Sequence, residues 1–80
     1  MALGFIAKDP ESKEDHCPSV WVDEETSDIV VQGWWADAAT VEECKRVGSI
    51  PDTEGVVRLP ARMVEALRRA CDVADGSAVR

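Results

Sequence analysis

The chain has 80 residues, a length that allows one small domain. It carries 16 acidic and 9 basic side chains and a formal net charge of -7, which argues against sequence-independent binding to phosphate backbones. No apolar run approaches the ~20 residues that a membrane span needs, and residues 1–7 lack the early positive charges of an export signal. We therefore expect a cytoplasmic globular protein.

The negative charge is concentrated towards the N-terminal end. Residues 1–28 hold eight acids and two bases, residues 29–53 hold four acids and two bases, and residues 54–80 hold four acids and five bases. A basic partner fits the acidic end better than DNA does. The alternative interpretation is that the charge only keeps a small protein in solution.

The N-terminal segment, residues 1–18, is predicted to be an arm. Gly4–Ala7 can add an edge strand, and the polar stretch KDPESKEDHCP predicts a loop over residues 8–18. The α+β domain is then expected to span residues 19–73, and residues 74–80 are expected to form a flexible tail.

A β-hairpin is the clearest local signal in the chain. Residues 20–22 (VWV) and 29–31 (IVV) are rich in β-forming side chains, and the polar residues between them predict a loop of three to five residues. Either Thr26 or Ser27 is expected near the left-handed conformation. Gly33 is expected to mark a bulge or a close approach of two backbones.

The second half predicts two helices and a third strand. Thr40 and Glu43 have the spacing of a capping box, and Gly48 is placed to end the short helix that they begin. Residues 55–59 are expected to form the third strand, which leads through Pro60 into the second helix. The fold class is therefore α+β, with a three-stranded antiparallel sheet, four-stranded if the N-terminal arm joins it, and the C-terminal helix covering the sheet.

Each predicted helix has an apolar stripe. The second helix is expected to face the core with Met63, Val64, Leu67, Ala70 and Cys71. The first helix has a narrower stripe of Val41, Cys44 and Val47. On such stripes a thiol usually serves as a small hydrophobic side chain.

No arrangement of residues predicts catalysis or a cofactor. His16 and Cys17 are adjacent, so in an extended segment they point apart and are badly placed as a base and a nucleophile. A zinc site of one histidine and three cysteines is conceivable, but no pair has the short spacing that is typical of zinc ligands. We expect no enzyme, no cofactor and no metal.

The tryptophans are the candidate functional residues. Trp34 and Trp35 are neighbours, so in a strand they point to opposite faces and at most one can enter the core. The other is expected on the face of the sheet that no helix covers, where exposed tryptophan is a common mark of a protein interface. The alternative is that the N-terminal arm or a helix covers this face. The predicted partner-binding residues are Trp21, Val30, Trp34 and Trp35, with acidic support from Asp23, Glu24 and Glu25.

The stretch VVRLPARMVEALRRAC, residues 56–71, supports a competing hypothesis. A strand that enters an amphipathic helix is typical of ribbon-helix-helix DNA-binding proteins, and DNA would then contact Arg58, Arg62, Arg68 and Arg69. Nine residues follow Cys71, too few for the second helix of such a unit. Its strand offers only Arg58 as a base reader, where major-groove readers use several side chains. Direct DNA binding is therefore the alternative function.

Four stretches together resemble a set of small actinobacterial proteins of unknown function. They are KDPES (8–12), CPSVWVDEET (17–26), DIVVQGW (28–34) and IPDTEGVVRLPARMVEAL (50–67). Members of this set tend to be encoded beside helix-turn-helix regulators, so the resemblance implies an accessory role in transcription regulation.

The resemblance spans residues 4–70 and implies no activity and no site residues. The chain departs from the pattern at Ala7, where glycine is common, and at Trp35, where lysine is common. The second departure adds apolar area to the expected interface. We expect a module that binds a protein partner, such as a helix-turn-helix regulator, and that can pair as a homodimer.

Overall fold

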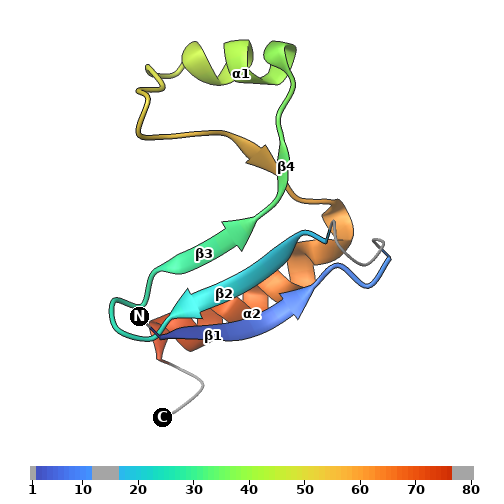
Figure 1. Cartoon of the computed structure of the whole chain (residues 1–80), viewed down its shortest axis with the longest axis vertical. Helices are drawn as coiled ribbons and strands as arrows, with labels where there is room; N and C mark the ends of the chain where they lie inside the picture. The colour runs from blue at the N-terminus through green and yellow to red at the C-terminus, as the bar shows by residue number, and fades with distance from the viewer. Residues whose placement is uncertain (1, 12–16, 77–80) are drawn as a thin grey trace.

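A computed structural model describes residues 2–11 and 17–76 of the chain. The elements in chain order are β1 (Leu3–Lys8), β2 (Ser19–Asp23), β3 (Ile29–Gln32), β4 (Trp34–Trp35), α1 (Ala38–Lys45), β5 (Val57–Arg58), the 3₁₀ turn η1 (Ala61–Met63) and α2 (Val64–Asp75). They form a three-stranded antiparallel sheet, a second sheet of two strands, and two helices, of which α2 packs on the larger sheet (Figure 1). The predicted α+β class is confirmed.

The larger sheet has the strand order β1-β2-β3. The predicted hairpin of β2 and β3 is present, and Ser27 in its loop has the expected positive φ, 66°. The Asp23 carboxylate holds the turn by accepting hydrogen bonds from the backbone N–H groups of Glu25 (2.9 Å) and Thr26 (3.3 Å). An aspartate that bonds to amides further along the chain is a common way to close such a loop.

The third strand of this sheet is β1, and the prediction that residues 55–59 would fill that place is wrong. β1 pairs with the free edge of β2, with a register shift between Phe5 and Ala7. Residues 57–58, as β5, pair instead with β4. The reason is that β3 runs through Gly33 into β4 and carries the chain away from the sheet before β5 begins (Figure 1).

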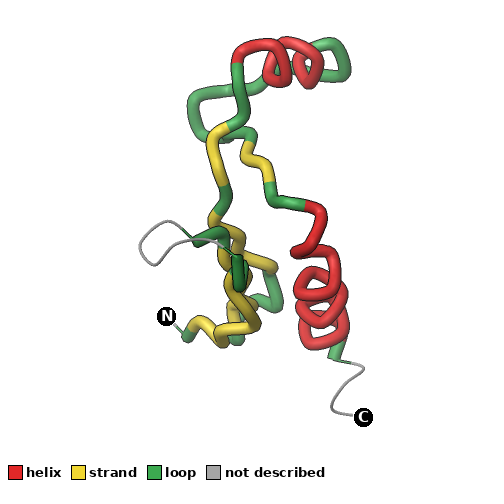
Figure 2. The backbone as a smooth tube through the Cα atoms, turned by 90° about the vertical axis from the view of Figure 1, so that its right-hand side faces the viewer, coloured by secondary structure: helices red, strands yellow, loops and turns green. Residues whose placement is uncertain are grey.

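The core lies between α2 and one face of β2. Val20 and Val22 meet Met63, Ala66 and Ala70, all of which are buried. The predicted stripe was partly misplaced, because Val64 and Cys71 are exposed while Ala66, which the prediction omitted, is buried. Figure 2 shows the sheet and α2 as two separate layers.

The C-terminal helix is longer than predicted. It continues to Asp75, and Gly76 ends it in the left-handed conformation (φ 77°) that favours glycine at this position. The expected tail boundary at residue 74 therefore falls inside the helix. Residues 77–80 lie outside the described part of the chain.

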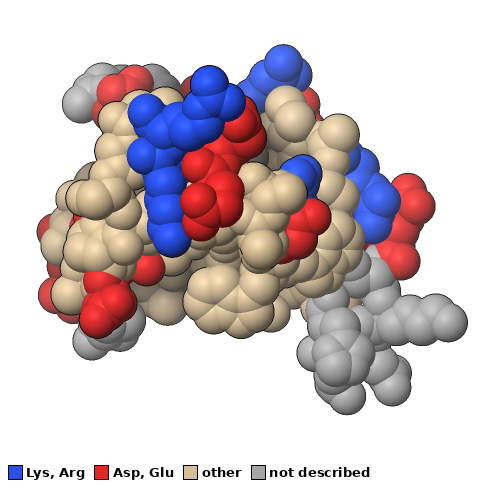
Figure 3. All heavy atoms as spheres, turned by 90° about the horizontal axis from the view of Figure 1, so that it is seen from above, with Lys and Arg blue, Asp and Glu red and all other residues tan. Residues whose placement is uncertain are grey.

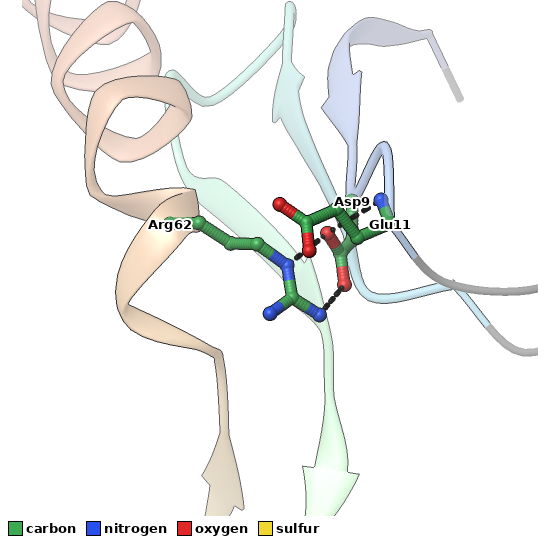
Figure 4. A network of polar contacts seen from close by, with 3 residues as sticks. All are labelled: Asp9, Glu11 and Arg62. Atoms are coloured by element: carbon green, nitrogen blue, oxygen red, sulfur yellow. Dashed lines mark hydrogen bonds and ion pairs between the residues drawn. The ribbon is translucent and has the colours of Figure 1, made fainter.

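A buried ion pair joins the N-terminal strand to the start of the C-terminal helix. Asp9, directly after β1, is 1% exposed, and its backbone N–H donates to the carbonyl of Pro18 at 2.8 Å. Arg62 in η1 holds both carboxylate oxygens, with Nε 2.6 Å from Oδ1 and a terminal nitrogen 2.7 Å from Oδ2 (Figure 4). The loop predicted over residues 8–18 is thus firmly attached at Asp9, and the hydrogen bonds to Asp9 raise the pKa of Arg62 above its usual value.

Loss of the buried carboxylate should destabilise the whole domain. We expect Asp9→Ala to lower the free energy of unfolding by about 3 kcal/mol, the low end of the range for a broken buried ion pair, because Arg62 keeps some contact with water. Glu65→Ala is the matched control, since it removes an exposed carboxylate 3.7 Å from Arg68 and should cost about 0.5 kcal/mol or less. Urea unfolding of the wild type and both variants measures the free energy of unfolding. An equal loss in the two variants would show that the Asp9–Arg62 pair stabilises the domain no more than an exposed pair does.

Candidate protein interface

The structure divides the predicted partner-binding residues between two separate surfaces. Trp21 and Val30 are cross-strand neighbours in the larger sheet. Trp34 and Trp35 form β4, beyond the end of that sheet. The sequence prediction treated the four as one surface because alternation along a strand says which residues share a face but not where the next strand pairs.

The first surface is the face of the larger sheet that points away from α2. Val20 and Val22 on β2 point into the core, so Trp21 between them points the other way. Phe5 and Val30 are its partners on the two neighbouring strands and share that face. Leu3, two residues before Phe5, extends it along β1. We call Leu3, Phe5, Trp21 and Val30 the open face.

The open face is apolar and accessible. The Phe5 ring stands edge to face against Trp21, with centroids 6.2 Å apart and an interplanar angle of 66°. Phe5 is nevertheless 58% exposed and Leu3 is 41% exposed. Within the described residues no helix lies over this face, since α2 occupies the opposite side of the sheet (Figure 2).

Sequence reasoning missed Phe5 and Leu3 as members of this surface. Both residues lie in the segment predicted to be an N-terminal arm, and neither was assigned to the interface. The alternation of Leu3, Gly4 and Phe5 was a usable signal, because it places the two large side chains on one face of a strand.

The predicted acidic residues lie at the hairpin tip, at one end of the open face. Asp23 is paired with Leu3 in the register, and its carboxylate is engaged in closing the turn. Glu24 lies against the edge strand, where its N–H donates to the carbonyl of Ala2 at 2.8 Å and its carboxylate lies next to Gly4. Glu25 and Asp28 are exposed. The tip therefore presents four acids within six consecutive residues and no base.

The second surface belongs to residues 33–59, which we call the extension. It comprises β4, α1 and β5 and projects away from the sheet and α2 (Figures 1 and 2). Neither tryptophan of β4 enters the core: Trp34 is 45% exposed and Trp35 is 81% exposed. Trp35 pairs with Val57 on β5, and its ring lies over Gly55, where a Cβ atom would stand 3.1 Å from it.

Helix α1 starts earlier than predicted and buries nothing. Its N-cap is Asp37, whose carboxylate accepts from the backbone N–H of Thr40 at 2.9 Å, so the predicted capping box at Thr40 and Glu43 is wrong. The helix begins at Ala38, so Thr40 and Glu43 both lie inside it. No residue of α1 is buried, and Val47 beyond its end is 95% exposed. The apolar stripe predicted for this helix therefore faces no core of its own chain.

The four arginines of the DNA-binding alternative do not form one contact surface. Arg58 donates to the hydroxyl of Thr40 at 2.8 Å, and Arg62 holds the buried Asp9. Arg68 lies 3.7 Å from Glu65 on the solvent-exposed side of α2, and Arg69 is also exposed. The strand β5 pairs with β4 of its own chain, whereas a ribbon-helix-helix strand pairs across a dimer. These engagements weigh against DNA reading by residues 56–71.

The three cysteines form no disulfide with one another and differ in burial. Cys17 is buried, whereas Cys44 and Cys71 are exposed, so the expectation that these two serve as core side chains is wrong. His16 lies outside the described residues. In the described ranges no group of three or more histidine, cysteine or acidic side chains is arranged to hold a metal ion, and no pocket is enclosed.

None of the helices in residues 2–11 and 17–76 has the length and apolar character needed to cross a bilayer. No protein family model, no curated protein and no solved structure matches the chain.

Gly33 should be essential for the extension. A Cβ atom there would stand 2.5 Å from the carbonyl oxygen of Arg58, which confirms the predicted close backbone approach. We expect Gly33→Ala to cost on the order of 2 kcal/mol of local stability. The readout is hydrogen exchange at Ala36, whose N–H donates to the carbonyl of Val56 at 3.1 Å.

The matched control for this prediction is Gly48→Ala. A Cβ atom at Gly48 meets nothing within 4 Å, so exchange at Ala36 should stay as in the wild type. Equal protection in the two variants would show that the contact at Gly33 is not what holds the extension together.

The start of α1 should be sensitive to acid. Hydrogen bonding from the side chain and backbone of Thr40 lowers the pKa of Asp37, and the charge of Arg58 lowers it further. A lowered folded pKa means that the cap contributes fully above the ordinary aspartate pKa and is lost as pH falls through the lowered value. The Thr40 amide resonance should therefore move towards its non-helical chemical shift only as the pH falls below the ordinary aspartate pKa, and Asp37→Asn should abolish that change. An unchanged titration in the variant would assign it to another group.

Proposed function

We propose that the protein is a non-enzymatic interaction module whose open face binds a basic segment of a protein partner, and that this partner is a transcription regulator. The observation that carries the proposal is the aromatic pair on the face of the sheet opposite α2, in which Phe5 is 58% exposed and packs against the half-buried Trp21. Aromatic side chains that are packed together and yet accessible are the usual anchors of protein interfaces.

The charge around the open face sets the chemistry of the partner. The hairpin tip carries Asp23, Glu24, Glu25 and Asp28 at one end of this face. Acidic residues at the rim of an apolar patch favour a partner that combines apolar side chains with lysine or arginine, and they speed its encounter at low salt. The apolar contacts supply the affinity, and the acidic tip supplies orientation and the preference for a basic partner.

A transcription regulator fits these requirements. Proteins that contact DNA carry basic surfaces to neutralise phosphates. An acidic module can bind to such a basic surface because the two charges attract each other. The resemblance to small proteins encoded beside helix-turn-helix regulators supports the same partner class. A cytoplasmic location belongs to this proposal, because the regulator acts there.

Truncation of the more exposed aromatic side chain of the open face, Phe5, should abolish most of the binding. We expect Phe5→Ala to weaken binding of the partner by about 2 kcal/mol, roughly 30-fold in Kd, as for an interface hot spot. Val47→Ala is the control, because Val47 is 95% exposed but lies on the extension. The measurement is affinity capture from native cell lysate with the wild type and both variants, followed by calorimetry with the captured protein.

The expected result is one regulator that is retained by the wild type and by Val47→Ala, is lost with Phe5→Ala, and binds more weakly as salt is raised. Capture that Phe5→Ala leaves intact would remove the open face as the site. Enrichment of DNA without a protein would favour the DNA-binding alternative.

A further inference from the structure

We propose that the extension, residues 33–59, is a dimerisation element that docks on the extension of a second copy of this chain. The proposal concerns a surface that the regulator-binding proposal does not use, so either can fail without the other.

The extension lacks the internal support that its secondary structure requires. Helix α1 has eight residues and buries none of them, whereas isolated helices shorter than about 12–15 residues are marginal in water. The strands β4 and β5 have two residues each, and an isolated two-stranded sheet is also marginal. Neither α1 nor the β4–β5 pair packs substantially on the larger sheet or on α2. A surface from outside the chain must complete this part of the fold.

The chain exposes more surface than a compact monomer of its size. Its accessible area, taken over the whole chain, is 5990 Å², against about 4,700 Å² expected for a folded monomer of this mass. The radius of gyration is 14.0 Å, against about 11.6 Å for a compact domain of this length. The part of the chain that projects from the body in this way, residues 33–59, leaves its own surface uncovered by the other described elements.

The apolar side chains needed for such an interface are present on the extension. Trp35 is the most exposed aromatic side chain in the described residues, and its cross-strand partner Val57 is 38% exposed. Directly opposed residues share a face of a two-stranded sheet. Trp34 and Val47 add further exposed apolar area. Tryptophan is among the residues most enriched at the centres of interfaces.

The extension carries charges of both signs, so two copies can pair there with less repulsion than at their acidic sheet ends. The first 28 residues carry eight acids and two bases, so two copies repel each other when they meet by their sheet ends. The extension carries five acids and three bases, and part of this charge is paired internally, as in Lys45–Glu42 at 3.3 Å and Arg46–Glu43 at 2.7 Å. From the end that carries the extension, side chains of both signs lie side by side on a largely uncharged surface (Figure 3).

The geometry permits contact without bringing the acidic tips together. The hairpin tip lies at the start of β3, and the extension leaves from the other end of the same strand. A two-fold axis through the paired extensions therefore places the two acidic tips at the far ends of the dimer. Such an interface uses the same patch on both copies, which is the usual arrangement of homodimers.

The test is the oligomeric state of the full chain by sedimentation velocity over a range of concentrations. We expect a dimer, and we expect Trp35→Ala to raise the dimer dissociation constant about 30-fold. Phe5→Ala is the matched control, since it removes an exposed aromatic side chain from the open face and should leave the dimer intact. A wild type that stays monomeric, or a dimer that Phe5→Ala breaks and Trp35→Ala does not, would overturn the proposal.

A second experiment does not depend on the tryptophan variant folding correctly. Cys44 lies on α1 in the extension and Cys71 lies on α2, and both thiols are exposed. A short bismaleimide should give covalent dimers with Cys71→Ser, which keeps Cys44, and few with Cys44→Ser, which keeps Cys71. The reverse pattern would place the contact on α2 and contradict the extension as the dimerisation element.

Discussion

The bidentate pair of Asp9 and Arg62 is the interaction on which the rest of the fold depends. After β3 the chain leaves the sheet, and it returns only at Pro60. Arg62 lies two residues after that return, and Asp9 lies directly after β1. Their contact fixes the chain at the point where it returns to the larger sheet. It also holds the first turn of the C-terminal helix beside the N-terminal strand. Without it, the position of α2 would depend on apolar packing, that of the five buried core residues and of the partly buried side chains around them.

The buried position of Asp9 explains why one ion pair has this importance. An exposed pair adds little, because water competes for both partners. Asp9 is almost fully shielded from water, so separation of the pair removes the only guanidinium that the described residues place against its carboxylate and leaves a buried charge with weaker compensation. In a chain this small, where total stability is only several kcal/mol, such a contact is a large share of the whole.

Local patterns in the sequence identified the hairpin and the helix that covers the sheet, and they narrowed the left-handed residue to Thr26 or Ser27, of which Ser27 has the positive φ. These features depend on neighbours within a few positions, where alternation and turn chemistry determine the outcome. The Asp9–Arg62 pair joins residues 53 positions apart and lies in a polar stretch with no periodicity, so nothing in the sequence predicted it. The error over residues 55–59 has the same origin, because a strand pattern does not state which strand it pairs with.

The sequence named several residues of the candidate site, but it did not predict how these residues are divided between two surfaces. Trp21 and Val30 were placed on the correct face of the sheet because period-two alternation is reliable within a hairpin. Trp34 and Trp35 were assigned to the same surface, but Gly33 directs the chain elsewhere at that point. The apolar area of Trp35 therefore belongs to the extension and not to the open face.

The separation of the two apolar surfaces gives each its own electrostatic setting. The open face ends at an acidic tip, whereas the extension has nearly balanced charge with internal ion pairs. Apolar area alone does not choose a partner, since any hydrophobic surface would bury it equally well. Charge does choose, because like-charged surfaces oppose contact and complementary ones favour it. One small chain can in this way present a surface for a basic protein and another for its own copy.

Completion of the extension by a second copy would also couple its folding to association. The helix α1 and the short strands β4 and β5 gain their missing support only in the dimer, so part of the free energy of contact is spent on ordering them. The dissociation constant then reflects both the interface and the local folding equilibrium of residues 33–59. Any change that stabilises the isolated extension, such as a stronger cap at Asp37, would tighten the dimer without touching the interface. This coupling between local folding and association distinguishes a dimerisation element that folds on contact from a surface that is already rigid before it binds.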